Sequence, residues 1–366
     1  MKLKKKTRVL VAMSGGVDSS VAALLMKKKG YEIIGAFMKN WSDKESFEEC
    51  GWKKEWEMAQ KIASRLDIPI IAFDYEKEYR EQVIEKMFKD YKKGITPNPD
   101  IDCNKKIKFP FLIKEAKSLK CDFVVTGHYG QIKKTKKCFK LLRAKDESKD
   151  QSYFLYTLKQ SELKNLIFPI GEYTKKEVRE IARKNKFPNH DKKSTVGICF
   201  IGKINLKKFL QKKIKPKKGK ILSPEGIQIG EHDGIYYYTI GQRLGPKYGI
   251  DISKNTDNKK NLKRWYVARK NGKKNEIIAA PENHEILYRK EVFLKNPHWI
   301  NIKPKNNEKI HARIRQVGEL LPSKISYDKK KIKVILSKAI TGISEGQACV
   351  LYQKQKCLGG GEIRFG

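Results

Sequence analysis

The stretch Ser14-Gly15-Gly16-Val17-Asp18-Ser19-Ser20 decides the fold, because it joins two apolar segments of different periodicity. The run 8–13 before it is apolar after its first residue and predicts a strand, whereas the spacing of apolar residues over 17–29 predicts a helix. Two glycines at such a turn let the backbone approach an anion, and the first N–H groups of the helix are unpaired. The stretch therefore predicts a phosphate-binding loop. It is not a Walker loop, since no lysine follows the glycines, and it lacks the glycine spacing of GxGxxG.

Strand and helix patterns alternate beyond this loop. Apolar runs at 31–38, 68–73 and 121–126 predict strands, and the segments 52–66, 76–91 and 105–117 predict helices. This alternation predicts an α/β fold with a doubly wound parallel sheet. Ligands of such sheets bind at the carboxyl ends of the strands, so Met38 and Gly127 lie where a nucleotide base or ribose would sit, although simple packing explains either residue equally well.

Length and charge bound the class of protein. A chain of 366 residues and 42.4 kDa has room for two or three domains. Lys and Arg number 81 against 41 Asp and Glu, which gives a formal net charge of +40. This excess favours a polyanionic partner such as nucleic acid, and the alternative is a lysine-rich composition of solvated faces.

In the second half of the chain, the regular alternation of strand and helix patterns ends. A hairpin is predicted at 129–144, and Thr174 with Glu177 predicts the start of a helix. The Lys/Pro/Gly run 212–220 indicates a boundary, after which short strands dominate, and strand signals after about residue 284 are spaced as in a small barrel. We expect a catalytic domain over 1–211, a small β-rich domain over 212–280 and a C-terminal β-barrel over 281–366, with a polar loop at 253–263.

The seven cysteines form no CxxC pair, so neither a zinc ribbon nor any other set of metal ligands is predicted from them. Their odd, scattered distribution is typical of reduced thiols in a cytosol. No stretch approaches the roughly 18 apolar residues that a membrane span needs. We therefore expect a cytoplasmic protein that does not enter a membrane.

The segment 96–104, Thr-Pro-Asn-Pro-Asp-Ile-Asp-Cys-Asn, carries the second chemical signal. Its two prolines are expected to hold the chain out of a helix until about Asn104. Cys103 would then lie at or just before a helix start, where a thiolate is favoured. A buried, inert cysteine is a better description of Cys121, which lies in an apolar strand.

The SGGVDSS stretch resembles the PP-loop of the ATP pyrophosphatase family, whose members cleave ATP to AMP and pyrophosphate. With six further motifs, the chain resembles the tRNA-specific 2-thiouridylases over nearly its whole length. These motifs are TPNPDxxCN at 96–104, TGHY at 126–129, KDQSYFLYTL at 149–158, GICFIG at 197–202, IGQRLG at 240–245 and CLGGG at 357–361. The resemblance implies that ATP, with Mg²⁺, is bound by Ala12, Met13, Ser14, Gly15, Gly16, Val17, Asp18, Ser19, Met38 and Gly127.

The resemblance also implies a reaction, in which the C2 oxygen of the wobble uridine in tRNAs for Lys, Glu and Gln is adenylated and replaced by sulfur. A carbonyl oxygen is a poor leaving group, which is why ATP is needed. By resemblance Cys199 carries a persulfide, Cys103 attacks it and leaves a Cys103–Cys199 disulfide, and Asp100 is a general acid/base. The alternative for Asp100 is a turn-capping aspartate.

The same resemblance implies contacts with the anticodon arm of tRNA. Near the extruded base it indicates Asn98, Pro99, Asp100, His128, Lys149, Asp150 and Gln151, and in the last domain Arg313, Ile314 and Gln347. Because Arg313 and Arg315 alternate with Ile314, we expect the two arginines to share one strand face that suits phosphate.

Two departures from the family pattern are present. In the helix after the second strand, the family has an acidic pair with Asp, and this chain has Glu55 and Glu57. Before the second cysteine, the family has Asp-Ser-Thr-Gly, and this chain has Ser-Thr-Val-Gly at 194–197, so that Ser194 and Val196 stand in place of the Asp and the Thr. Any charge or capping role of that aspartate near Cys199 is thereby put in doubt.

Several alternatives stay open on the sequence alone. A PP-loop amidotransferase or synthetase would adenylate a small molecule and would need neither Cys103 nor Cys199. A noncatalytic RNA-binding module would not need an intact nucleotide-binding loop. An iron–sulfur cluster on Asp100, Cys103 and Cys199 would use the same residues as the disulfide chemistry. The expected partners are tRNA and a persulfide-donating relay protein or cysteine desulfurase, and the expected state is a monomer.

Overall fold

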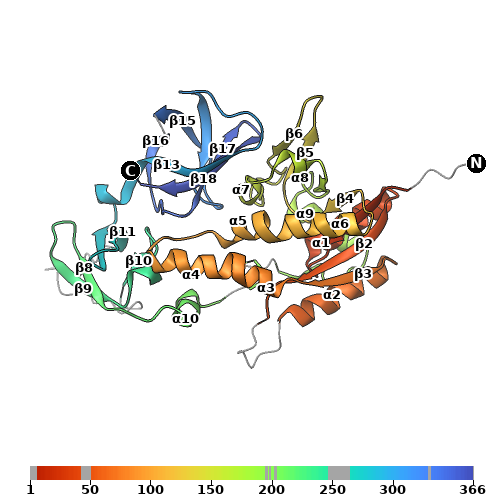
Figure 1. The fold of residues 1–366 in the computed structure, drawn as a ribbon, viewed down its shortest axis with the longest axis horizontal. Helices are drawn as coiled ribbons and strands as arrows, with labels where there is room; N and C mark the ends of the chain where they lie inside the picture. The colour runs from red at the N-terminus through yellow and green to blue at the C-terminus, as the bar shows by residue number, and fades with distance from the viewer. Residues whose placement is uncertain are drawn as a thin grey trace, which may run out of the picture.

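The computed structural model describes residues 6–42, 51–193, 197, 199–201, 204–245, 264–328 and 331–365. The predicted loop 253–263 and the departures at Ser194 and Val196 lie outside the described residues. The described residues form three sheets, of which the first lies near the N-terminus, a small one lies at the opposite end and a barrel lies beside both (Figure 1). None of the helices in the described part of the chain is both long enough and apolar enough to cross a membrane.

The first sheet has five parallel strands in the order β3-β2-β1-β4-β7, as the strand and helix alternation predicts. Its strands are β1 Arg8–Ala12, β2 Glu32–Lys39, β3 Ile70–Asp74, β4 Phe123–Val125 and β7 Leu166–Ile167. Val9 and Val11 pack in one apolar cluster and Leu10 in another, because successive side chains of a strand point to opposite faces. The sheet is therefore covered on both faces.

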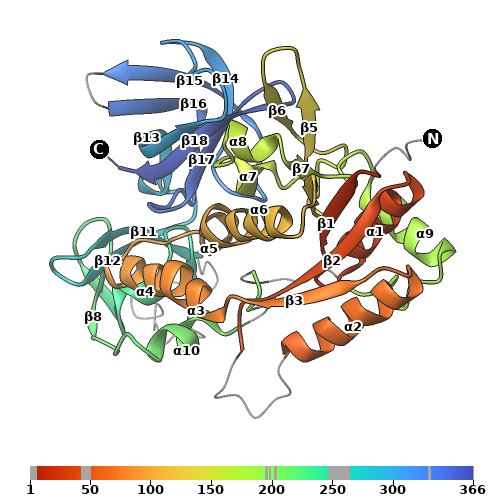
Figure 2. The ribbon, with the colours of Figure 1, turned by 45° about the vertical axis from the view of Figure 1, so that its right-hand side comes forward.

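Three helices cover the face of Val9 and Val11, namely α1 Val17–Lys28, α2 Gly51–Arg65 and α9 Lys175–Lys184. The predicted capping box of α9 is confirmed, since the Thr174 hydroxyl accepts from Glu177 N and the Glu177 carboxylate accepts from Thr174 N. The opposite face is covered by α6 Phe109–Ser118, which lies on the other side of β1 from α1 (Figure 2).

Two long helices pass beside this face, and each contains a π-helical turn. The first runs through α3 Glu76–Tyr79, the π turn Arg80–Ile84 and α4 Glu85–Lys92. The second runs through α5 Pro99–Cys103, the π turn Asn104–Lys108 and α6. Such turns are rare and are frequent at functional sites.

The expectation that prolines exclude a helix before Asn104 is wrong. Helix α5 begins at Pro99, and the Asn98 side chain caps it by accepting from Ile101 N at 3.3 Å. A proline at the first helical position is tolerated because the N–H that it lacks would have no partner in the helix. Cys103 therefore lies inside a continuous helical segment and not at its start.

A hairpin, three short helices and a small sheet continue the chain. The predicted hairpin is confirmed as β5 Gln131–Lys134 and β6 Phe139–Leu142. The short helices are α7 Ser152–Leu155, α8 Gln160–Leu163 and α10 Leu206–Gln211. The small sheet, in the order β10-β11-β12-β8-β9, comprises β8 Gly219–Leu222, β9 Gln228–His232, β10 Arg243–Leu244, β11 Trp265–Asn271 and β12 Glu276–Pro281.

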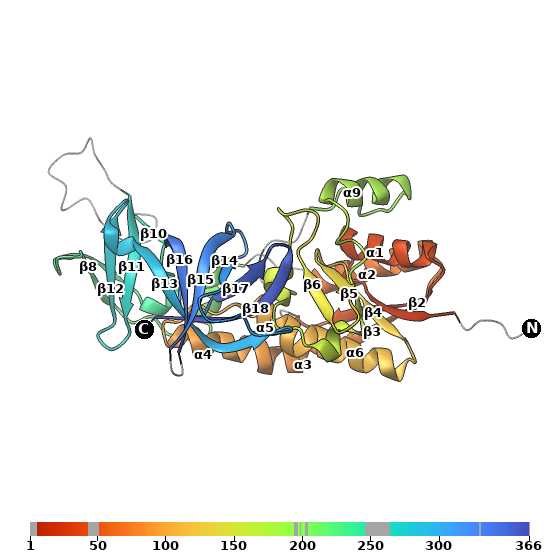
Figure 3. The same ribbon diagram turned by 90° about the horizontal axis from the view of Figure 1, so that it is seen from above.

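The last part of the chain is a closed antiparallel barrel, as predicted. Its strands are β13 Tyr288–Trp299, β14 Lys309–Arg313, β15 Leu321–Asp328, β16 Lys331–Thr341, β17 Ala348–Gln353 and β18 Lys356–Arg364. Pairing of β13 with β18 closes the barrel, and pairing of β18 with β6 joins it to the hairpin of the first part (Figure 3). The barrel is thereby joined to the part of the chain that carries the α/β sheet.

Candidate active site

The predicted phosphate-binding loop lies between β1 and α1. Gly15 has φ +70, a left-handed conformation that favours glycine, and Gly16 is the N-cap residue of α1. A Cβ atom on Gly15 would lie 2.4 Å from the Glu55 carbonyl oxygen. The Ser19 hydroxyl donates to Gly16 O at 3.0 Å and accepts from Ser14 N at 3.2 Å, which fixes the turn.

Asp18 of this loop is held by two partners from distant segments. Its carboxylate accepts from the Tyr129 hydroxyl at 2.9 Å and from Lys175 Nζ at 2.6 and 2.7 Å. Met38 is buried in β2, the neighbour of β1. Gly127 packs directly on α1, since a Cβ atom there would lie 2.7 Å from Ser19 N.

The structure brings Cys103 and Cys199 together, although they are 96 positions apart in the sequence. Their sulfur atoms are 3.8 Å apart, and the Cys103 thiol donates toward the Cys199 sulfur. A disulfide has a sulfur–sulfur distance of about 2.05 Å, so a shift of roughly 1.8 Å would join them. Cys103 is fully buried, whereas Cys199 is half-buried.

Three polar groups surround Cys199. Asp100 Oδ1 accepts from the backbone N–H of Cys199 at 2.8 Å, and the Tyr79 hydroxyl donates to its carbonyl oxygen at 2.6 Å. Lys108 Nζ lies 3.7 Å from the Cys199 sulfur. Burial raises the pKa of Asp100, against the opposing effects of the Cys199 N–H and of Lys108. Asp100 therefore takes up a proton more readily than a solvated aspartate.

The two thiols differ in acidity, in the opposite sense to the sequence expectation. The hydrogen bond from Cys103 lowers the pKa of Cys199, and Lys108 adds to this effect against the cost of burial. Burial and the neighbouring Cys199 raise the pKa of Cys103 well above its usual value. The prediction of a favoured thiolate at Cys103 is wrong because this residue is buried within a helix, and of the two thiols it is Cys199 whose pKa is lowered.

The segment 126–129 links the nucleotide loop to the thiol pair. Gly127 packs on the first turn of α1, and Tyr129 holds Asp18. Between them, His128 Nε2 lies 3.5 Å from Lys108 Nζ, and its Nδ1 lies 2.7 Å from the Thr126 hydroxyl. Burial and the charge of Lys108 hold the pKa of His128 well below its usual value, so the ring is neutral. Because an ammonium group only donates, Nε2 accepts and Nδ1 carries the proton.

Sequence reasoning missed Lys108 and Tyr79. Lys108 follows Cys103 by five residues, a spacing that places the two on the same face only where the helix makes a π turn, as it does over Asn104–Lys108. No α-helical periodicity marks this lysine, and two others, Lys105 and Lys106, lie two and three residues before it. Tyr79 carries no motif, and its contact with Cys199 follows from tertiary packing alone.

Some of the residues expected to contact tRNA lie close together. Gln347 from the barrel donates to the carbonyl oxygens of Thr96 and Pro97 at 3.1 and 3.0 Å, and Asn98 Nδ2 donates to Gln347 Oε1 at 3.3 Å. Pro99 follows directly, at the first position of α5. The barrel thus lies against the segment that leads to Asp100.

Other expected contacts are internal. Asp150 and Arg313 are both buried, and Arg313 Nη1 donates to Asp150 Oδ2 at 2.7 Å. Ile314 is also buried, while Lys149 is exposed and Gln151 accepts from Tyr129 N. The expectation of one face bearing Arg313 and Arg315 is wrong, because β14 ends at Arg313 and the chain bends there, which leaves Arg315 exposed.

Two hollows in the surface lie away from the thiol pair. One of about 300 Å³ is lined by residues that include Leu24 and Arg65, and one of about 650 Å³ by residues that include Lys92 and Lys270.

The difference in thiol acidity predicts a pH profile for alkylation. With iodoacetamide, Cys199 is expected to react with a midpoint below the value of about 8.5 for a free thiol, and Cys103 to react slowly at every pH. A Lys108→Gln variant should raise the Cys199 midpoint, because a positive charge that favours the thiolate is lost. Peptide mass spectrometry measures both rates. Lys105→Gln, at an exposed position on the same helix, is the control, and an unchanged midpoint in Lys108→Gln would contradict the assignment.

Comparisons with known proteins agree with this geometry. Residues 7–203 match the family described as "tRNA methyl transferase HUP domain", residues 207–281 the "tRNA methyl transferase PRC-barrel domain" and residues 289–363 the "Aminomethyltransferase beta-barrel domain". The glycine loop on its parallel sheet thus defines an ATP-using HUP-domain protein of the PP-loop type.

Full-length relatives define the family more closely. The tRNA-specific 2-thiouridylase MnmA of Lactobacillus helveticus is 40% identical, with 98% of this chain and 95% of the relative covered. That of Ruthia magnifica is 40% identical with 99% of each covered, and that of Streptococcus thermophilus is 41% identical with 98% and 95% covered. The chain belongs to the family of tRNA-specific 2-thiouridylases.

Proposed function

We propose that this chain replaces the C2 oxygen of the wobble uridine with sulfur in tRNAs for Lys, Glu and Gln. ATP activates the base, and a cysteine persulfide supplies the sulfur. The observation that carries the proposal is the segment 126–129, which contacts the nucleotide loop through Gly127 and Tyr129 and, through His128 and Lys108, the pair Cys103–Cys199. One short segment therefore couples an ATP site to a dithiol.

The first step is adenylation. The C2 oxygen of the uridine attacks the α-phosphorus of ATP, an O–P bond forms, and pyrophosphate leaves with the electrons of the broken bond. The N–H groups at the start of α1 favour the leaving phosphates, and Gly15 and Gly16 leave room for them. No group of three His, Cys, Asp or Glu side chains among the described residues is arranged to hold a metal ion, so Mg²⁺ would arrive on the triphosphate.

The second step transfers sulfur. The terminal sulfur of a Cys199 persulfide attacks C2, and AMP leaves with the uridine oxygen. Cys103 attacks Cys199 Sγ, so that the Cys103–Cys199 bond forms, the bond to the terminal sulfur breaks, and its electron pair stays on the sulfur now attached to C2. Two thiols are thus oxidised while one sulfane sulfur is reduced, and a thiol reductant must reset the disulfide. Asp100, beside Cys199 N, takes the proton that Cys103 loses.

The alternative of an iron–sulfur cluster would use the same three side chains, Asp100, Cys103 and Cys199. The Asp100 carboxylate bonds to a backbone N–H, and the two sulfur atoms contact each other directly. The dithiol route needs no such cluster. Iron and labile-sulfide analysis of anaerobically purified protein distinguishes the two routes.

The partners follow from the same chemistry. A net charge of +40 favours tRNA, and the lowered pKa of Cys199 suits a thiolate that accepts sulfur from a persulfide-bearing relay protein or cysteine desulfurase. We propose a monomer that binds one tRNA, with a catalytic domain over 1–211, a central domain over 212–280 and a barrel over 281–366 that contributes Gln347. His128, being neutral, would contact the extruded base without adding charge.

The rival function is a PP-loop amidotransferase or synthetase that adenylates a small molecule. Such an enzyme would have no use for the paired thiols. Two of the matched family descriptions contain the words methyl transferase, and a methyl transfer would not explain the paired thiols either.

Product analysis tests the proposal. With ATP, a persulfide donor and unmodified tRNA, we expect 2-thiouridine in the tRNA and one AMP for each sulfur inserted. AMP formation should depend on tRNA and should not respond to small amines or acids. AMP formation driven by a small acceptor, with unmodified uridine left in the tRNA, would favour the rival function.

A further inference from the structure

A lysine from a distant segment lies at the glycine turn of the nucleotide loop. Lys192 follows α9, and its Nζ lies 3.4 Å from the carbonyl oxygen of Gly15. Asn189, three residues earlier, donates to the same carbonyl oxygen and to the Ser20 hydroxyl, each at 3.0 Å. Asn189 is almost fully buried, so this segment is fixed against the loop.

The same ammonium group forms an ion pair with Glu55 of α2. Lys192 Nζ lies 2.8 Å from both carboxylate oxygens, and the two side chains are 32% and 36% exposed. The main chain of Glu55 also packs against the loop, since a Cβ atom on Gly15 would collide with the Glu55 carbonyl oxygen. The Lys192 ammonium is therefore held beside the turn but keeps access to solvent.

The loop itself has no lysine, although its ligand is a polyanion. Lys175, a second lysine that contacts the loop, is 12% exposed and forms hydrogen bonds to both carboxylate oxygens of Asp18. Lys192 is held less strongly by Glu55, because an ion pair whose side chains are one-third exposed contributes little free energy. A triphosphate brings several negative charges to the position where Glu55 supplies one.

We propose that Lys192 is a phosphate-binding residue of the ATP site, which exchanges Glu55 for the triphosphate when ATP binds and neutralises the pyrophosphate as it leaves. This inference rests on the proposed function, since it assigns the loop to ATP. Glu55 holds the ammonium group beside the turn in the free enzyme and competes with the phosphates for it.

The two partners of this ion pair should then act in opposite directions on ATP binding. Lys192→Gln should weaken ATP binding about 10- to 100-fold, the effect of losing a charge-assisted hydrogen bond. Glu55→Gln should tighten ATP binding by about two- to fivefold, because it removes an exposed competitor. The KM for tRNA should change in neither variant.

Titration of the full chain with ATP, by calorimetry, measures these effects, and Lys193→Gln at the adjacent exposed position is the control. If the pair only braces the loop, both variants weaken ATP binding, and that result would overturn the proposal. Equal affinity in wild type and Lys192→Gln would also overturn it. The 2-thiouridine assay on wild type judges the proposed function separately, because ATP titration does not depend on the product formed.

Discussion

Cys199→Ser is expected to lower the rate of 2-thiouridine formation by roughly 10³-fold or more, since a serine cannot carry a sulfane sulfur. Adenylation does not use this residue, so tRNA-dependent release of pyrophosphate should continue. Cys103→Ser should also abolish product, but for a different reason. Without tRNA its Cys199 should keep the persulfide, detectable by intact-protein mass. With ATP and tRNA it should stay joined to C2 through that sulfur as a protein–tRNA adduct, because the thiol that lies 3.8 Å away is no longer present to attack Cys199 Sγ.

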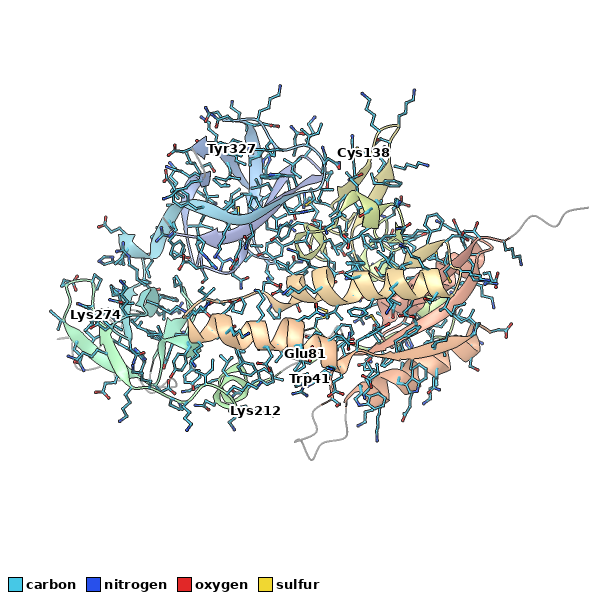
Figure 4. The ribbon with its side chains drawn as sticks, viewed as in Figure 1. Trp41, Glu81, Cys138, Lys212, Lys274 and Tyr327 are labelled. Carbon is cyan, nitrogen blue, oxygen red and sulfur yellow. The ribbon has the colours of Figure 1, made fainter. Side chains whose placement is uncertain are left out.

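Cys138→Ser is the matched control for both variants. Cys138 lies in the β5–β6 hairpin, labelled in Figure 4, where it contacts Thr135 and Asn301 and not the thiol pair. This variant should retain thiolation. Substantial 2-thiouridine formation by Cys199→Ser would remove the persulfide from the mechanism.

Gly127→Ala should lower kcat/KM for ATP, although Gly127 lies outside the glycine loop. The added Cβ would lie 2.7 Å from Ser19 N and 2.8 Å from Asp18 C, so the first turn of α1 must shift. Overpacking of this kind costs about 1–3 kcal/mol of stability. A displacement of about 1 Å at a reacting group lowers kcat/KM by about 10²-fold. We expect that loss in kcat/KM for ATP, measured by tRNA-dependent AMP release.

Gly51→Ala is the matched control for this prediction, because an added Cβ there meets no atom of the described residues within 4 Å. It should leave both the melting temperature and AMP release near those of the wild type. A Gly127→Ala variant with normal ATP kinetics would show that close packing of segment 126–129 on α1 is not required.

The α/β part of the fold could be predicted from local pattern. Apolar runs and helical periodicity identified β1, α1 and β2 because each element is continuous in sequence and buried against a neighbour. Strand β15, Leu321–Asp328, has a weak sequence signal, since its inward-facing residues Leu321, Ser323 and Ile325 include a polar one. Alternation is weak when a buried position is polar.

The site was less accessible to sequence reasoning. The loop at 14–20 carries its own chemistry, but the proximity of Cys103 to Cys199 depends on how two segments 96 residues apart pack together, and only the family resemblance indicated it. Lys108 depends on a π turn that no sequence pattern marks. Arg313 is expected on a phosphate-binding strand face because it alternates with Ile314 and Arg315, whereas in the structure it is buried and pairs with the buried Asp150.

The central claim is that two neighbouring thiols deliver the sulfur, and a single turnover tests it most directly. The full chain, persulfidated on Cys199, is mixed anaerobically with ATP and unmodified tRNA, without a reductant, and disulfide-linked peptides are counted against 2-thiouridine. We predict one Cys103–Cys199 disulfide for each 2-thiouridine formed. Formation of 2-thiouridine while Cys103 and Cys199 both remain free thiols would contradict the claim.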